Sequence, residues 1–169
     1  MQNGHCPICG IPADAEFFDD AHIISPLPER GQQVVLASFQ LPRQYCGILE
    51  NFAQFTDLQA VQNEQIHTPG LEWMILRNGQ PLSPYIKFEI LINPWGIGCY
   101  PIAVRLDENA KIELIVRNRG YNDQGGLFPI NKVGGRISGR YWYNRVYGGN
   151  GVAAGCETFQ PMVGALPQW

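Results

Sequence analysis

The chain is poor in charged residues, which make up 16% of its 169 positions, against about a quarter in typical globular domains. Acidic residues outnumber basic ones by 15 to 12, for a net charge of −3. This balance argues against a protein that tracks nucleic-acid phosphates, because such proteins need a basic surface. Low charge suits a surface partly covered by other subunits. Loops rich in Gly, Asn and Gln would produce the same composition.

The sequence has no apolar run of about 18 residues, so no membrane span is expected. Residues 1–6 have neither a charged region nor an apolar stretch of the signal-peptide kind, which favours folding in a reducing cytoplasm. The cysteines are odd in number and scattered, and we expect no disulfide framework. They are Cys6, Cys9, Cys46, Cys99 and Cys156. Cys46 and Cys99 fall in expected strands, where a core role is the usual one.

No catalytic constellation is evident, and we expect no enzyme. The segment most similar to a nucleophile elbow, residues 135–139, lacks the Gly-x-Ser-x-Gly spacing. The adjacent carboxylates at 19–20 and 107–108 would point to opposite faces of a strand and make no acid/base pair. The Gly-rich run 148–155 lacks the Lys-Ser/Thr of a phosphate-binding loop. A zinc-dependent enzyme would need a general base that the sequence does not supply.

The chain does contain repeated two-residue alternation. Ile112, Leu114 and Val116, for example, alternate with polar neighbours, the pattern of a half-buried strand. Asn78-Gly79 is a strong hairpin signal, and Gly47 indicates a bulge or a close approach of two backbone segments. We expect strands over residues 32–39, 45–55, 71–76, 84–92, 100–106, 111–117 and 133–147. The predicted fold is an all-β, antiparallel β-sandwich (jelly-roll-like) of about seven to eight strands.

Three regions follow from this pattern. Residues 1–31 are predicted to form an N-terminal arm, because Pro26, Pro28 and Gly31 separate them from the first clear alternation. Residues 32–147 would form the sandwich. Residues 148–169 would form a Gly-rich C-terminal arm.

The N-terminal arm carries Cys6-x-x-Cys9, a spacing that can hold one tetrahedral metal ion from a tight turn. His22 and His5 are the nearest histidines, so a zinc ion held by Cys6, Cys9, His22 and His5 is one hypothesis. Cys46, Cys156 or another subunit could also complete the site. An unligated pair of thiols and, less readily, a redox-active pair are the alternatives.

Basic and aromatic residues gather near the end of the last expected strand. Arg136, Arg140, Tyr141 and Trp142 are candidates for contacts with a partner, although an outward polar strand face would look the same. Phe159, Met162 and Trp169 are the corresponding candidates in the C-terminal arm. The tryptophans Trp73, Trp95 and Trp142 would either line a sugar-binding face or belong to the core.

A family resemblance rests on several quoted segments of residues 35–143. They are Phe39-Gln40-Leu41-Pro42, Gly47-Ile48-Leu49-Glu50-Asn51-Phe52, Glu72-Trp73-Met74-Ile75-Leu76-Arg77-Asn78-Gly79, Ile112-Glu113-Leu114-Ile115-Val116-Arg117-Asn118 and Gly135-Arg136-Ile137-Ser138-Gly139-Arg140-Tyr141. In pattern this region, about two-thirds of the chain, resembles small virion-associated proteins of tailed bacteriophages. The two arms lie outside it.

The resemblance implies a jelly-roll-like domain present in many copies in a phage head, neck or tail. The resemblance assigns no catalytic residues to this chain. We therefore expect a structural virion protein, for capsid decoration or as a head–tail or tail accessory, made in the host bacterial cytoplasm. Its partners would be copies of itself and other virion proteins, bound through the arms. The alternative is a carbohydrate- or receptor-binding module of a phage or bacterial protein.

Overall fold

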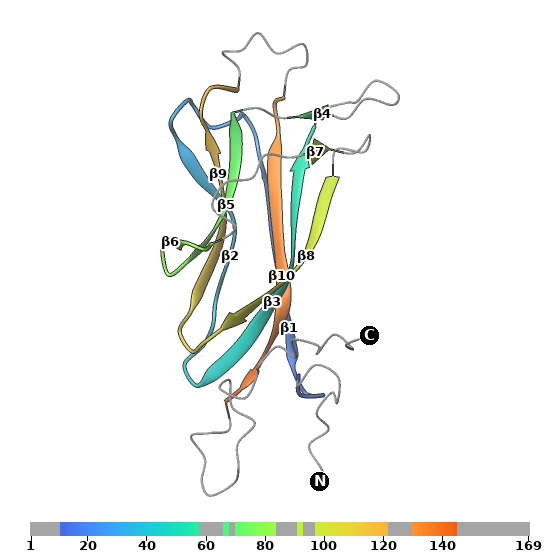
Figure 1. Cartoon of the computed structure of the whole chain (residues 1–169), viewed down its shortest axis with the longest axis vertical. Helices are drawn as coiled ribbons and strands as arrows, with labels where there is room; N and C mark the ends of the chain where they lie inside the picture. Colours follow the sequence, from blue (N-terminus) through green and yellow to red (C-terminus); the bar gives the residue numbers. More distant parts are fainter. Residues whose placement is uncertain are drawn as a thin grey trace, which may run out of the picture.

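The computed structural model describes residues 11–57, 66–67, 70–83, 91–92, 97–121 and 130–144. The elements assigned within these ranges are all strands, and most of them belong to two four-stranded antiparallel sheets (Figure 1). One sheet has the order β1-β10-β3-β8 and the other β2-β9-β5-β6, while β4 and β7 form a separate pair. The strands are β1 (Glu16–Ile24), β2 (Gln33–Gln40), β3 (Tyr45–Thr56), β4 (Ile66–His67), β5 (Leu71–Arg77), β6 (Gln80–Pro81), β7 (Leu91–Ile92), β8 (Ile97–Leu106), β9 (Lys111–Asn118) and β10 (Val133–Tyr143).

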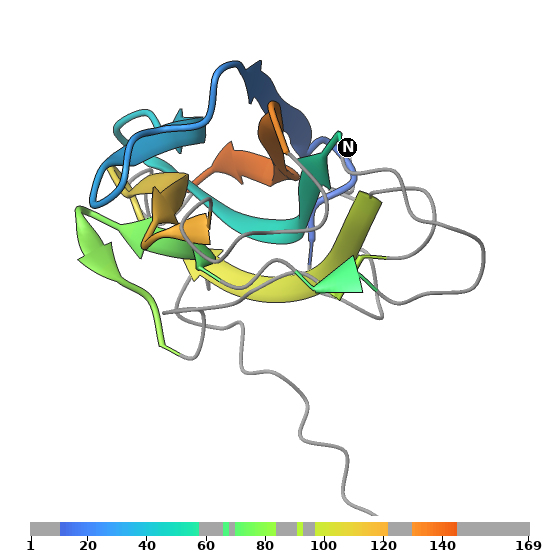
Figure 2. The ribbon, with the colours of Figure 1, turned by 90° about the horizontal axis from the view of Figure 1, so that it is seen from above.

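The two sheets face each other and enclose one apolar core (Figures 1 and 2). The alternation predicted for residues 111–117 is confirmed, since Ile112, Leu114 and Val116 are fully buried in this core. The largest side chains that are fully buried come from both sheets. They are Trp73, Leu36, Leu41, Leu49, Leu71, Ile75, Leu106, Ile112, Leu114 and Ile137. The predicted antiparallel β-sandwich is therefore confirmed.

The hairpin expected at Asn78-Gly79 is present. Both residues have positive φ, 52° and 77°, as the two-residue turn with the right twist requires. Among the described residues, the strand that returns beside β5 begins earlier than the expected 84–92, because Arg77 pairs directly with Gln80 in the short β6. A two-residue turn brings the chain back at once, so pairing begins immediately after Gly79. Residues 84–90 lie outside the described ranges, and β7 pairs with β4.

Gly47 lies at a close approach of β3 and β10. A Cβ at this position would lie 2.6 Å from the Arg140 carbonyl oxygen, so the close-approach interpretation is confirmed. The bulge in β3, where it pairs with β8, falls between Leu49 and Asn51 instead.

The predicted boundary of the N-terminal arm at residue 31 needs correction. All nine residues of β1 pair with β10, from Glu16↔Tyr141 to Ile24↔Val133, so the sandwich already includes residues 16–24. The apolar alternation of β1 is obscured because two of its inward-pointing side chains, Asp20 and His22, are polar. Residues 1–10 and 145–169, which include most of both predicted arms, lie outside the described residues.

Those two polar side chains bond to the main chain of β2, at the junction of the sheets. The Asp20 carboxylate accepts a hydrogen bond from the Ser38 N–H at 2.7 Å, and the His22 Nδ1 lies 3.1 Å from the Leu36 carbonyl oxygen. β2 is the end strand of its sheet, and an end strand has main-chain groups that its sheet does not pair. β1 therefore closes this side of the sandwich with side chains rather than with a further ladder.

Candidate functional site: the outer face of the β1-β10-β3-β8 sheet

Strand alternation divides the predicted partner-binding residues between two faces of one sheet. Ile137 is fully buried and points into the core, so its neighbours Arg136 and Ser138 point outward. Arg140 lies on this outer face too, with Phe17 and Ile23 from β1. We call this surface the outer face of the β1-β10-β3-β8 sheet.

Two arginine–carboxylate pairs cross the outer face between neighbouring strands. Arg136 of β10 bonds to Asp19 of β1 through both Nε (2.7 Å) and Nη2. Arg140 bonds in the same two-point manner to Glu50 of β3, with 2.9 Å between Nε and Oε2. The Arg140 guanidinium also lies 5.9 Å from the centre of the Phe17 ring. Two-point pairs of this kind orient both side chains, and each carboxylate neutralises the guanidinium that it binds.

The hydrogen bond from Arg136 lowers the pKa of Asp19, against an opposing effect of burial, and the positive charge of Arg136 adds to the lowering. Asp19 therefore stays ionised to a lower pH than an unpaired aspartate does.

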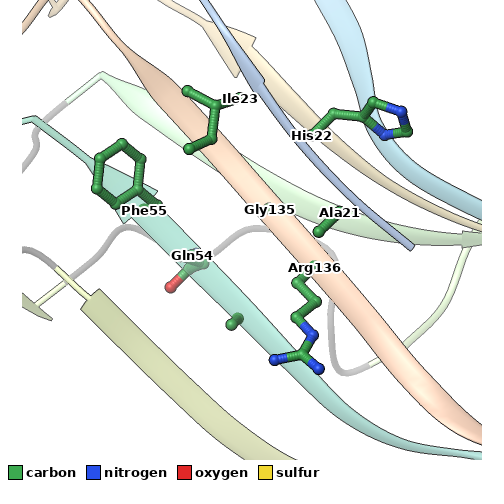
Figure 3. A pocket seen from close by; sticks show the side chains of 8 residues that line it. Ala21, His22, Ile23, Gln54, Phe55, Gly135 and Arg136 are labelled. Carbon is green, nitrogen blue, oxygen red and sulfur yellow. The ribbon is translucent and has the colours of Figure 1, made fainter. Parts of the chain in front are cut away.

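An apolar hollow of about 250 Å³ lies beside Arg136 (Figure 3). Ala21 and Ile23 of β1 and Ala53 and Phe55 of β3 line it, with Arg136 at one end. A second hollow of about 300 Å³ continues on the other side of Arg136. Its lining includes Asn51, Ala53, Arg136 and Ser138. Together we call these two hollows the trough.

The trough and its surroundings expose apolar side chains to solvent. Phe17 is 77% exposed and Ile23 is 60% exposed. By contrast, Cys46 and Ile48, nearer the other end of β3, are 1% and 7% exposed. Phe17 and Ile48 both lie opposite Arg140, so the exposed Phe17 is at the level of this covered part of β3, and Ile23 lies six residues further along β1. Exposed apolar side chains thus occur near both ends of β1 on this face, and groups of this kind are found at contact surfaces.

Tyr141 does not join the arginines on the outer face. Its ring packs against Phe39 and Tyr45 at centroid distances of 5.4 and 5.6 Å. Its hydroxyl donates a hydrogen bond of 2.6 Å to the Glu16 carboxylate. This bond is the main reason why the pKa of Tyr141 is raised, and burial and the nearby charge of Glu16 add to it. Trp142 alternates with Tyr141 and is half-buried. Phe159, Met162 and Trp169 lie outside the described residues.

Of the predicted zinc ligands, His22 is among the residues that the structure describes. Cys6, Cys9 and His5 lie outside the described residues, while His22 lies in β1 and directs Nδ1 at the Leu36 carbonyl. Among the residues that the structure describes, no group of three or more His, Cys, Asp or Glu side chains is placed to hold a metal ion. The zinc site stays a prediction.

Cys46 is disulfide-bonded, which corrects the expectation of free thiols at this position. Its partner is a cysteine whose side chain the structure does not describe. Cys99 lies opposite Ala53, seven residues along β3 from Cys46, or about 23 Å. A disulfide needs Cα atoms within about 7 Å, which leaves Cys6, Cys9 or Cys156. Sequence spacing alone does not reveal which cysteines meet in a fold.

The core interpretation of Trp73 is confirmed. Its side chain is fully buried, and its Nε1–H points to the Gly134 carbonyl oxygen at 3.4 Å. Trp73 therefore lines no sugar-binding surface. Trp95 lies outside the described residues.

Comparison with known proteins provides no family. No family model matches the chain, and no curated protein matches it. A crystal structure of dimeric latent PorU from Porphyromonas gingivalis is similar at 11% sequence identity with a TM-score of 0.32. The match covers 76% of this chain and 13% of the PorU chain. Within the described residues, no helix has the length and apolar character to cross a membrane.

Proposed function

We propose that the protein is a non-catalytic structural component of a tailed-phage virion, for capsid decoration or at a head–tail or tail junction. It would act by binding copies of itself and other virion proteins. The terminal segments, 1–10 and 145–169, would contribute to these contacts together with the outer face of the β1-β10-β3-β8 sheet.

The observation that carries this proposal is the chemistry of the outer face. Exposed Phe17 and Ile23 lie next to arginines whose charges are matched by Asp19 and Glu50. A surface of exposed apolar groups between matched ion pairs can be covered by another protein without isolating a charge. The resemblance over residues 35–143 supplies the phage assignment, and the outer face supports protein binding in general.

Two experiments test the proposal at its two levels. Mass spectrometry of virions purified from the phage that encodes the chain should detect the protein, and immunogold labelling should place it on the particle. Absence of the protein from virions would refute the phage assignment.

The binding surface is tested separately with purified protein by light scattering. We expect Ile23→Ser to weaken self-association about tenfold, because the exposed Ile23 side chain would lose its apolar contacts. Val35→Ser is the matched control, since Val35 is 46% exposed on β2 of the other sheet. Equal effects of both substitutions would refute a role for the outer face.

The alternative of a carbohydrate-binding module loses support because Trp73 belongs to the core. The half-buried Trp142 is the remaining described tryptophan for such a role. Specific hits on a glycan array that disappear in Trp142→Ala would favour this alternative over the structural one.

A further inference from the structure

One end of β3 carries polar side chains on its inward face. Gln54 and Thr56 are each 1% exposed. They alternate with Ala53 and Phe55, which line the trough on the outer face, so both point inward, as the core residue Phe52 does. The chain therefore buries an amide and a hydroxyl at consecutive inward positions of one strand.

Both side chains have a buried polar atom without a hydrogen-bond partner among the described residues. These atoms are the Gln54 Nε2 and the Thr56 Oγ1. The buried amide of Asn118 differs: its oxygen accepts hydrogen bonds from two main-chain N–H groups at 2.8 and 3.0 Å, and its nitrogen donates to the Pro28 carbonyl oxygen at 2.9 Å. A buried polar atom left unpaired costs a substantial share of a protein's stability, so such atoms in native proteins usually have an ordered water as partner.

The register of the sheet explains why the neighbouring strands supply no side-chain partner for Gln54. It lies opposite Gly135 of β10 and Gly98 of β8, and a glycine has no side chain to offer. From the facing sheet, Leu114 and Leu36 pack over Gly135, where a Cβ would lie 2.6 and 3.1 Å from them. These neighbours of Gln54 therefore provide no polar side chain.

Thr56 lies opposite the fully buried, apolar Val133. Residues i and i+2 of a strand are about 7 Å apart on the same face, and the longer Gln54 side chain can lean along the strand toward Thr56. A water molecule with one hydrogen bond to each of two polar atoms joins atoms up to about 6 Å apart. Water is thus the smallest ligand that can meet both groups.

We propose that the Gln54 Nε2 and the Thr56 Oγ1 together bind one buried water molecule, which is a structural ligand of this end of the sandwich. The water accepts a hydrogen bond from the Gln54 amide and shares a second one with the Thr56 hydroxyl, which can donate or accept. Two such partners are enough for a buried water, which makes about two to four hydrogen bonds. The proposal goes beyond the proposed function, since it concerns the interior of the isolated chain, and its failure would leave the virion assignment unaffected.

A high-resolution crystal structure of the full chain tests the site directly. We expect electron density for one water within hydrogen-bond distance of both the Gln54 Nε2 and the Thr56 Oγ1. No density between these atoms, or a side-chain or main-chain group of the protein in that place, would overturn the inference.

Oxygen-17 relaxation dispersion of the solvent gives the number of long-lived internal waters in solution. Thr56→Val keeps the shape of the side chain, removes its hydroxyl and should lower this number by one. Ser138→Ala is the matched control, because it removes a hydroxyl from the outer face of the same sheet, and it should leave the number unchanged. Equal numbers for Thr56→Val and the wild type would contradict the inference.

Urea denaturation separates a bound water from an unpaired hydroxyl by the sign of the effect. With the water bound, Thr56→Val should raise the unfolding equilibrium constant about two- to tenfold, because the water and the Gln54 donor lose a partner. An unpaired hydroxyl would instead be replaced by a methyl group that suits the core, so an unchanged or lowered constant would overturn the inference.

A double-mutant cycle shows whether the two groups share one ligand. Gln54→Met combined with Thr56→Val should raise the unfolding equilibrium constant by about two- to fivefold less than the product of the two single effects, because removal of both groups releases the water. Single effects that simply multiply would mean that the two side chains do not bind the same water.

Discussion

Gly139 of β10 lies at a close contact of β10 with the main chain of β3 and with the Phe18 ring. Substitution of Gly139 by alanine is therefore a sharp test of this packing. A Cβ at this position would lie 2.1 Å from the Ile48 carbonyl oxygen and 2.7 Å from the Phe18 ring. The Phe18 ring in turn stacks on Phe39 at a centroid distance of 4.1 Å. The added methyl group therefore meets a main-chain oxygen on one side and a packed ring on the other.

We expect Gly139→Ala to lower the free energy of unfolding by about 3 kcal/mol, the upper part of the range for overpacking, because the nearest neighbour is main chain and cannot rotate away. For a chain of this size that corresponds to a fall in the melting temperature of about 6–12 °C. Urea denaturation followed by tryptophan fluorescence, with circular dichroism as a second probe, measures the change.

Ser138→Ala is the matched control, because Ser138 is the preceding residue of β10 and points to the outer face. It should change the free energy of unfolding by less than about 0.5 kcal/mol. A Gly139→Ala protein within that same margin of the wild type would refute the reasoning. It would mean that β3 and β10 separate at little cost where the structure has them in contact.

Three further predictions concern single side chains. Because the bond from Arg136 lowers the pKa of Asp19, its stabilisation is present above the unfolded pKa of about 4 and is lost as the pH falls through the folded pKa. Asp19→Asn should therefore destabilise the protein at pH 7 by at most about 1 kcal/mol, and by less as the pH falls below about 4, as urea titrations at neutral and acid pH would measure. Because the pKa of Tyr141 is raised, its stabilisation is present below the unfolded pKa of about 10 and is lost above the folded one. Tyr141→Phe should remove this alkaline loss in thermal melts between pH 8 and 12, and an unchanged profile would contradict the Glu16 bond. Trp73→Ala should cost about 3–5 kcal/mol in urea denaturation, and a cost below about 1 kcal/mol would contradict its full burial.

Local alternation was sufficient to predict most strands. β9 is read correctly from residues 111–117, because Ile112 and Leu114 meet the same core and their neighbours do not. The Asn78-Gly79 turn is equally local, since its two positive φ values suit these residue types. Side-chain period and turn chemistry are properties of a few adjacent residues, and a sequence displays them directly.

β1 shows where this approach fails. Its inward positions include Asp20 and His22, which bond to the main chain of β2. A strand that satisfies its neighbour with polar side chains loses the apolar period by which strands are recognised. The predicted N-terminal boundary of the sandwich therefore falls too far along the chain, because β1 already begins at Glu16.

The class of fold follows from the order of the residues alone, because the alternation of apolar and polar residues and the turn residues act over short distances. The composition of the outer face, in contrast, depends on how distant strands come together. Arg136 and Asp19 are 117 positions apart, and Arg140 and Glu50 are 90 apart. These pairs exist because β10 lies between β1 and β3. Strand order of this kind depends on how the whole chain buries its apolar surface, which no short segment encodes.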